Sequence, residues 1–145
     1  MIMKELFTFL CGILYLIGYP FGWSYEDTSI YICIYLWPIL CCISTLPLWI
    51  VSIIHINKIK GIIFTILSSI YSLYYIYYTN LVIARYSIDN KNSFMNCMLD
   101  LKVLAERLNV SYEELNVFIY VILFIGIILF NFILYKIVKF ILNKY

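Results

Sequence analysis

The sequence predicts an all-α integral membrane protein with four transmembrane helices and a short amphipathic helix between the third and the fourth. Hydrophobic residues make up 65% of the 145 residues and charged residues only 12%, and the mean hydropathy is +0.96. Soluble domains contain about 45–50% apolar residues, and a domain of this size still exposes about a third of the surface of its unfolded chain. A soluble fold could not hide this much apolar surface from water.

Four apolar runs point to the same class. A helix needs about 20 predominantly apolar residues to cross the hydrocarbon layer of a bilayer. The chain has four such runs without Asp, Glu, Lys or Arg: residues 6–23, 29–54, 61–84 and 115–135. We expect a lipid bilayer to surround these four spans, and we interpret residues 1–145 as a single membrane domain.

The first run has the features of an uncleaved signal-anchor. Lys4 is followed at once by Glu5, so the positive region that precedes a signal peptide is weak. No small-x-small cleavage pattern follows the run, which leads into Tyr19, Pro20 and Phe21. We therefore expect the first helix to be retained.

The second run contains two prolines, Pro38 and Pro47. Each lacks a backbone N–H and leaves a carbonyl without its helical donor four residues earlier, so we expect the helix to bend at both positions. The hydroxyls of Ser44 and Thr45 can bond backbone groups that such a bend releases. The bends are expected to shape the helix bundle.

The third run carries the most unusual side chains, in the stretch TILSSIYSLYYIYYTN at residues 65–80. Hydroxyl residues recur in steps of three and four, which places them along one helix face over roughly 20 Å. This hydroxyl stripe consists of Thr65, Ser68, Ser72, Tyr75 and Thr79, with Tyr71 and Tyr78 beside it and Asn80 at its end. Three interpretations stay open: packing between helices, a contact face for another membrane protein, or one wall of a water-filled pathway.

An amphipathic helix is predicted over residues 93–108. Apolar residues recur there in steps of three and four, with polar residues mostly on the other side: Phe94, Met98, Leu101, Ala105 and Leu108. Asn109 suits the left-handed conformation that ends a helix. Ser111 and Glu114 then have the spacing of a capping box, with Ser111 as the N-cap of the fourth span.

The same region, LAERLNVSYEELN at residues 104–116, also has the pattern of a DNA-binding helix-turn-helix. Its second helix would continue into the fourth span, however. Residues 85–114 hold four cations and five acids, whereas phosphate binding requires an excess of Lys and Arg. We therefore expect no nucleic acid among the partners.

The distribution of cations predicts the orientation. They lie before the first span, between the second and third, and after the fourth: Lys4, then Lys58 and Lys60 beside His55, then Lys136, Lys139 and Lys144. Since cytoplasmic loops carry an excess of Lys and Arg, we expect both termini in the cytoplasm. The predicted location is a cell membrane, namely a bacterial inner membrane.

No pattern of catalytic or metal-binding residues emerges. The spans hold no acid or base of the kind that proton relays use, and Asn131 in the fourth span is expected to hydrogen-bond within the bundle. The cysteines follow no metal-ligand spacing: Cys11, Cys33, Cys41, Cys42 and Cys97. We expect a protein that is not an enzyme and needs no cofactor or metal.

These features favour a binding role. The expected partner is another membrane protein, or a second copy of the chain, engaged through the hydroxyl stripe and the amphipathic segment. Four short spans with little outside them are similar in architecture to several colicin immunity proteins, which implies an immunity or exclusion role against a pore-forming toxin or phage. The alternatives are a holin-like pore-forming effector and an accessory subunit of a membrane complex.

Overall fold

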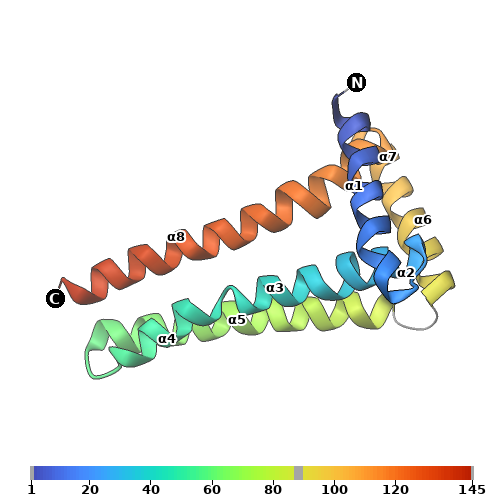
Figure 1. Ribbon diagram of the computed structural model, residues 1–145. Helices are drawn as coiled ribbons and strands as arrows, with labels where there is room; N and C mark the ends of the chain where they lie inside the picture. The colour runs from blue at the N-terminus through green and yellow to red at the C-terminus, as the bar shows by residue number, and fades with distance from the viewer. Residues whose placement is uncertain (1, 87–89, 145) are drawn as a thin grey trace. The chain divides into compact units, whose positions relative to one another are not determined.

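The computed structural model describes residues 2–86 and 90–144, which form helices and turns without a strand. In this part of the chain, four helices are long and apolar enough to cross a membrane: Ile2–Phe21, Tyr25–Ile54, Ile59–Tyr86 and Tyr112–Asn143 (Figure 1). The prediction of an all-α chain with four potential spans is confirmed at this level. Several helices extend beyond the apolar runs, because backbone hydrogen bonds continue through polar residues until a cap or turn ends them.

The first helix, α1 (Ile2–Gly18), is continued by the short helical turn η1 (Tyr19–Phe21). Helical structure therefore ends two residues before the end of the apolar run 6–23. Gly22 has a φ of 67° in the left-handed region, which glycine adopts without steric cost. The chain turns there, and Trp23 N–H donates to the Gly18 carbonyl at 3.1 Å.

The second span consists of four helical pieces: α2 (Tyr25–Ser29), the π-helical turn η2 (Ile30–Leu36), α3 (Trp37–Ile43) and α4 (Leu46–Ile54). Ser24 caps α2, and its hydroxyl accepts a hydrogen bond from Asp27 N–H at 3.1 Å. The wide turn η2 ends two residues before Pro38. The helix is interrupted at Ser44 and Thr45, and Pro47 lies in the first turn of α4, where a missing N–H is tolerated.

The third span is the single helix α5 (Ile59–Tyr86), followed by α6 (Asn90–Leu108). Asn109 has a φ of 53°, and Val110 N–H donates to the Ala105 carbonyl at 3.1 Å. The left-handed helix end predicted at Asn109 is therefore confirmed. In α6, Leu101 and Ala105 are buried, whereas Leu108, expected on the same apolar face, is 56% exposed.

The fourth span combines α7 (Tyr112–Val117), the π-helical turn η3 (Phe118–Leu123) and α8 (Phe124–Asn143). Ser111 caps α7: its hydroxyl accepts from Glu114 N–H at 3.1 Å, and the Glu114 carboxylate accepts from Ser111 N–H at 3.0 Å. This reciprocal pair satisfies two backbone donors at the start of the helix.

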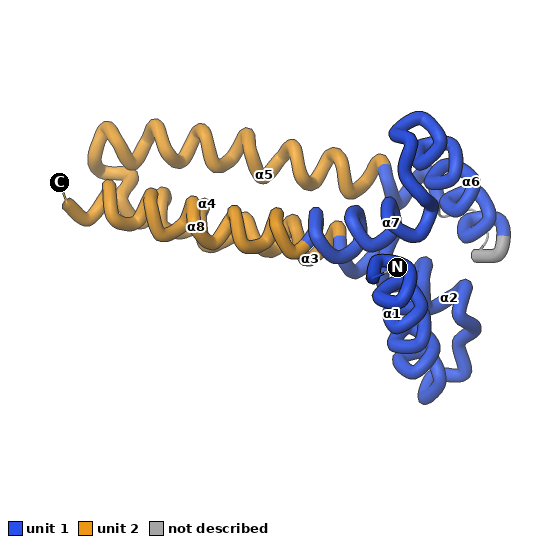
Figure 2. The backbone as a smooth tube through the Cα atoms, turned by 90° about the horizontal axis from the view of Figure 1, so that it is seen from above, with its two compact units in different colours: residues 1–37, 82–124 blue, residues 38–81, 125–145 orange. Residues whose placement is uncertain are grey.

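The chain divides into two compact units (Figure 2). Unit 1 comprises residues 1–37 and 82–124, and unit 2 comprises residues 38–81 and 125–145. The core of unit 1 contains Leu101 and Ala105 of α6 together with Leu115 of α7. At the edge of this unit, Asp100 of α6 accepts hydrogen bonds from Arg85 and Tyr86, at 2.8 Å from both the Arg85 Nη2 and the Tyr86 hydroxyl.

Unit 2 contains α4 and most of α3, α5 and α8. Its buried apolar cluster joins α4 to α8 through Leu48, Val51, Val138 and Leu142, and Phe64 and Tyr71 of α5 pack against it. Gly61 lies against the His55 carbonyl, so closely that a Cβ atom would overlap it. Glycine at this position therefore allows α5 to start beside the end of α4.

Candidate functional site

Most of the hydroxyl stripe of α5 faces the interior of unit 2. Ser68 and Thr79 are buried, and Tyr71, Ser72 and Tyr75 are half-buried. The stripe therefore lies against the other helices of its own unit over most of its length, instead of forming a free polar surface.

Buried Asn131 of α8 is the centre of a polar network. Its side-chain Nδ2 donates to Ser44 Oγ at 2.6 Å, and the Tyr71 hydroxyl donates to its Oδ1 at 2.7 Å. The Tyr75 hydroxyl lies 3.2 Å from that of Tyr71. Because Ser44 follows α3 directly and Tyr71 belongs to α5, the network joins three segments of the chain. The hydrogen bonding expected of Asn131 is confirmed.

The helix break after α3 supplies further partners. Ser44 Oγ and Thr45 Oγ1 each donate to a backbone carbonyl three residues earlier, at 2.7 Å. Ser72 Oγ on α5 donates to Thr45 Oγ1 at 3.0 Å. The hydroxyls at the break therefore bond backbone carbonyls of α3 that the interrupted helix leaves without their usual donors. Because Thr45 also accepts from Ser72, α5 is held against the chain at the same place.

The two ends of the stripe behave differently. Near the start of α5, Thr65 Oγ1 donates to the Gly61 carbonyl at 2.8 Å and Ser68 Oγ donates to the Thr65 carbonyl at 3.1 Å, so both hydroxyls bond their own helix. At the other end, Thr79 Oγ1 lies 3.1 Å from Cys42 Sγ. Tyr78 and Asn80, which were grouped with the stripe, are exposed instead.

A second feature of α5 is an outward tyrosine face formed by Tyr74, Tyr77 and Tyr78. Their side chains are 63%, 67% and 55% exposed, and the rings of Tyr74 and Tyr78 stack with centroids 6.4 Å apart. Tyr74 lies near the middle of this 28-residue helix. Of these three tyrosines, only Tyr78 was among the residues predicted from the sequence. Tyr74 and Tyr77 lie in steps of three and four with aliphatic residues, so their spacing does not mark them as a polar face.

Unit 1 contains a cavity of about 70 Å³ between α1, α2, η2, α6 and α7. Its walls are mainly apolar, with three thiols and three tyrosine rings. Cys11 Sγ lies 3.2 Å from the Tyr25 hydroxyl, and Cys97 Sγ lies 3.3 Å from the Tyr120 hydroxyl. Burial raises the pKa of the Cys97 thiol, which disfavours its thiolate form.

The cysteines remain free thiols. Among residues 2–86 and 90–144, no group of three or more His, Cys, Asp or Glu side chains is placed to hold a metal ion. Pro38 and Pro47, predicted as bends, lie beside the π-helical turn and beside the helix break, respectively.

Comparison with protein-family models, with curated proteins and with solved structures finds no match for this chain. The class that the fold supports is a chain with four helices able to cross a membrane, as in a multi-pass membrane protein.

Proposed function

We propose that this chain is a multi-pass membrane protein whose role is to bind another membrane-inserted protein, without catalysis, through the outward tyrosine face of α5. The observation that supports this role is that the polar side chains of α5 fall into two sets, one facing the interior of unit 2 and one facing outward. Most hydroxyls of the stripe bond within unit 2, whereas Tyr74, Tyr77 and Tyr78 face outward.

Because these tyrosines lie far from the ends of the span, a protein is a better partner for the outward tyrosine face than lipid is. Tyrosines that anchor a span gather at the membrane surface, but Tyr74 lies near the centre of its helix. A hydroxyl in hydrocarbon costs free energy unless it finds a hydrogen-bond partner. A helix of another protein that presents carbonyl or side-chain oxygens provides such a partner together with ring contacts.

A pore lined by the stripe is less well supported. Ser72 and Tyr71 bond Thr45 and Asn131 of the same unit, so opening a lumen along this face would break those bonds. An immunity or exclusion protein acts by contact with a pore-forming toxin or phage protein. Binding of such a protein by direct contact is compatible with the outward tyrosine face of α5.

The orientation belongs to the same proposal. Both termini are expected on the cytoplasmic side of a bacterial inner membrane, because Lys58 and Lys60 at the start of α5 and the lysines near the end of the chain are expected there. The amphipathic segment in α6 is expected at the opposite membrane surface; its Leu101 and Ala105 pack with Leu115 of α7.

The first test measures membrane potential in bacteria induced to express the chain alone, beside an unrelated inserted protein. We expect no depolarisation, since a binding protein without its target conducts nothing. Prompt depolarisation would contradict the proposal and support the holin-like alternative.

The second test places a photo-crosslinking phenylalanine analogue at Tyr77, with the same analogue at exposed Ile63 of α5 as the control. We expect a discrete protein adduct from position 77 only. Changing Tyr74 and Tyr78 to Phe removes the hydroxyls but keeps the rings, and should reduce the adduct several-fold, whereas Tyr15→Phe on α1 should not. Adducts with lipid alone, or with a second copy of the chain, would overturn the assignment of the partner.

A further inference from the structure

A ladder of aromatic rings joins the turn after α1 to the beginning of the second span. The Phe21 and Trp23 rings have centroids 4.8 Å apart, and the Trp23 and Tyr31 rings have centroids 4.5 Å apart. The Tyr31 and Tyr35 rings follow at 6.1 Å. All four residues belong to unit 1, and together they are termed the aromatic ladder.

The backbone explains how the ladder is built. Gly22, with its φ of 67°, turns the chain between Phe21 and Trp23 so that their rings stack at an angle of 25°. Tyr31 and Tyr35 are four residues apart in the helical turn η2, a spacing that places side chains next to one another on a helix. The Trp23 ring lies between these two pairs and connects the turn to the helix.

The protein leaves much of the ladder uncovered. The exposed fraction is 64% for Phe21, 37% for Trp23 and 40% for Tyr31, and neighbouring Tyr19 is 73% exposed. Removing apolar surface of this kind from water is favourable in proportion to its area. A partner outside the chain is therefore expected to cover these rings.

The position of the ladder indicates which partner fits. The first potential span, Ile2–Phe21, ends at the ladder, and the second, Tyr25–Ile54, begins there. Between them, Ser24 and Asp27 form a capping box in which each side chain accepts a hydrogen bond from the backbone N–H of the other. Exposed rings and polar capping groups thus alternate within a few residues. The boundary between hydrocarbon and water accommodates both.

The chemistry of the rings agrees with this boundary. Trp and Tyr combine an apolar ring with one polar group, and they are enriched where one end of the side chain is apolar and the other is wet. Tyr25, directly beside the ladder in the sequence, also packs edge-on against Phe94 of α6, with centroids 5.9 Å apart. Because the amphipathic segment in α6 is expected at the same membrane surface, the ladder and this segment support one placement.

We propose that the aromatic ladder docks on the head-group region of the lipid bilayer. Its rings lie against the upper acyl chains, and the Trp23 indole N–H and the Tyr31 hydroxyl donate to lipid carbonyls and interfacial water. This contact sets the depth of the turn between the first two spans. It rests on the proposed membrane insertion, but it does not involve the outward tyrosine face, whose residues belong to unit 2.

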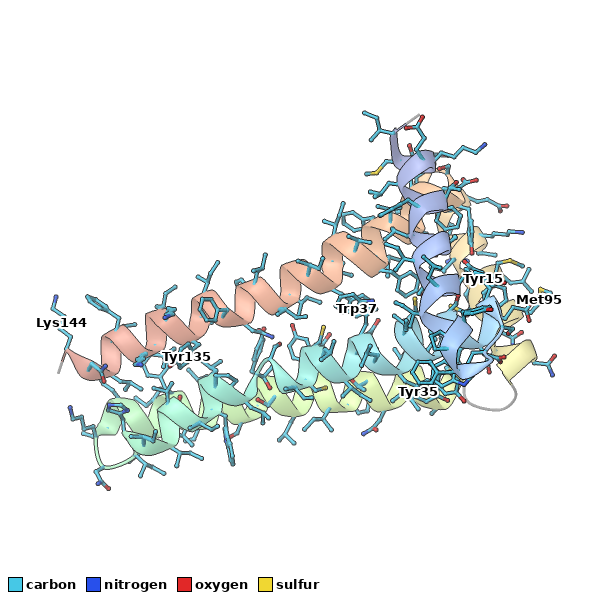
Figure 3. All side chains as sticks on the ribbon, in the orientation of Figure 1. Tyr15, Tyr35, Trp37, Met95, Tyr135 and Lys144 are labelled. Carbon is cyan, nitrogen blue, oxygen red and sulfur yellow. The ribbon has the colours of Figure 1, made fainter. Side chains whose placement is uncertain are left out.

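Trp37 provides an internal reference for depth. At about 1.5 Å per helical residue, the chain from Tyr25 to Trp37 covers roughly 15–18 Å, which is about half of a hydrocarbon layer of about 30 Å. Figure 3 labels Trp37 together with Tyr35 of the ladder. Trp37 is half-buried and belongs to the same unit as Trp23. We therefore expect Trp23 near the membrane surface and Trp37 near the bilayer centre.

The test measures tryptophan fluorescence in two variants of the full chain. Trp37→Phe combined with Trp49→Phe keeps only Trp23, and Trp23→Phe combined with Trp49→Phe keeps only Trp37. Each variant is reconstituted into phosphatidylcholine vesicles that carry a nitroxide quencher either on the head group or near the end of an acyl chain. We expect the head-group nitroxide to quench Trp23 several-fold more than the deep nitroxide does. Trp37 should show the reverse preference.

A second comparison tests whether the ladder holds Trp23 in place. Tyr31→Ala, added to the variant that keeps only Trp23, removes the neighbouring ring. Quenching of Trp23 by acrylamide from the water should then increase several-fold, because the indole ring is no longer held. Tyr15→Ala is the matched control: Tyr15 lies on α1 outside the ladder and is 57% exposed, so quenching should not change.

Three results would overturn the ladder proposal alone, provided that Trp37 responds to the deep nitroxide. Quenching of Trp23 by acrylamide but by neither nitroxide would place the ladder in water. Protection of Trp23 from all three quenchers would show that protein, such as a second copy of the chain, covers it. Stronger quenching of Trp23 by the deep nitroxide would place it within the hydrocarbon. Failure of the deep nitroxide to quench Trp37 would instead contradict membrane insertion itself.

Discussion

Gly18 shows how a single residue sets the distance between two helices. A Cβ atom at Gly18 would overlap the hydroxyl oxygen of Thr28, a fully buried residue on α2. That hydroxyl donates to the Ser24 carbonyl at 2.9 Å and is therefore held in place. In contrast, a Cβ atom at Gly12 on the same helix would meet nothing within 4 Å. Gly12 and Gly18 lie in the same apolar run of the sequence, and only the packing distinguishes their roles.

We expect Gly18→Ala to destabilise unit 1, because the added methyl group forces α1 away from α2; overpacking of this kind costs about 1–3 kcal/mol. Gly12→Ala is the matched control and should be neutral or stabilising by up to about 1 kcal/mol, since Ala favours a helix more than Gly does. Unfolding of the purified variants in mixed detergent, followed by circular dichroism, measures both. Equal stability of the two variants would contradict the close approach at Gly18.

At the scale of elements, α5 shows what periodicity can and cannot establish. Steps of three and four predict Ser68, Ser72 and Thr79 on one face, and in the structure all three are buried or half-buried. The choice between packing, contact and conduction depended on the neighbours of that face, which come from residues more than twenty positions away, such as Thr45 and Asn131. Lipid is as apolar as a protein core, so hydropathy alone does not distinguish an inward face from an outward one.

Local signals were more reliable for helix ends. The capping box at Ser111 and Glu114 and the left-handed Asn109 involve only residues within a few positions of one another. Such patterns depend on backbone geometry that a short segment determines by itself. The length of each helix was less predictable, because α8 continues to Asn143 through lysines that lie beyond the apolar run.

The link between α5 and α6 should depend on pH. The hydrogen bond from the Arg85 guanidinium holds the pKa of the Asp100 carboxyl below its ordinary value. A carboxyl whose pKa is lower in the folded protein contributes stability above its unfolded pKa of about 3.9, and loses it as the pH falls through the folded pKa. Since both side chains are substantially exposed, the contribution should be small and weaker in salt.

Comparing the unmodified chain with Asp100→Asn measures this contribution. We expect a small stability difference that is constant between neutral pH and about pH 5 and disappears only at more acidic pH. A difference that increased on acidification would show that the carboxyl is not stabilised in its charged form. Lys102→Gln, on the same helix, should leave the pH dependence unchanged.

On the scale of the molecule, the polar network around Asn131 joins segments from three parts of the sequence. We expect Asn131→Leu, which keeps a similar volume, to destabilise unit 2 by about 1 kcal/mol, because Tyr71 and Ser44 lose a partner. Tyr71→Phe removes the other side of the same bond, so the double variant should cost less than the sum of the two single changes. Titration with a denaturing detergent measures all three, and strictly additive effects would contradict the network.

The sequence by itself determined the fold class, the four potential spans and the helix caps. These follow from composition and from patterns within one helix, and the hydrophobic effect and backbone hydrogen bonding act on such patterns directly. Only the tertiary structure decided that the hydroxyl stripe is mostly satisfied internally and that three tyrosines face outward. The reason is physical: those arrangements depend on which helices pack together, and in a chain apolar on nearly every face, side-chain shape and a few buried hydrogen bonds make that choice.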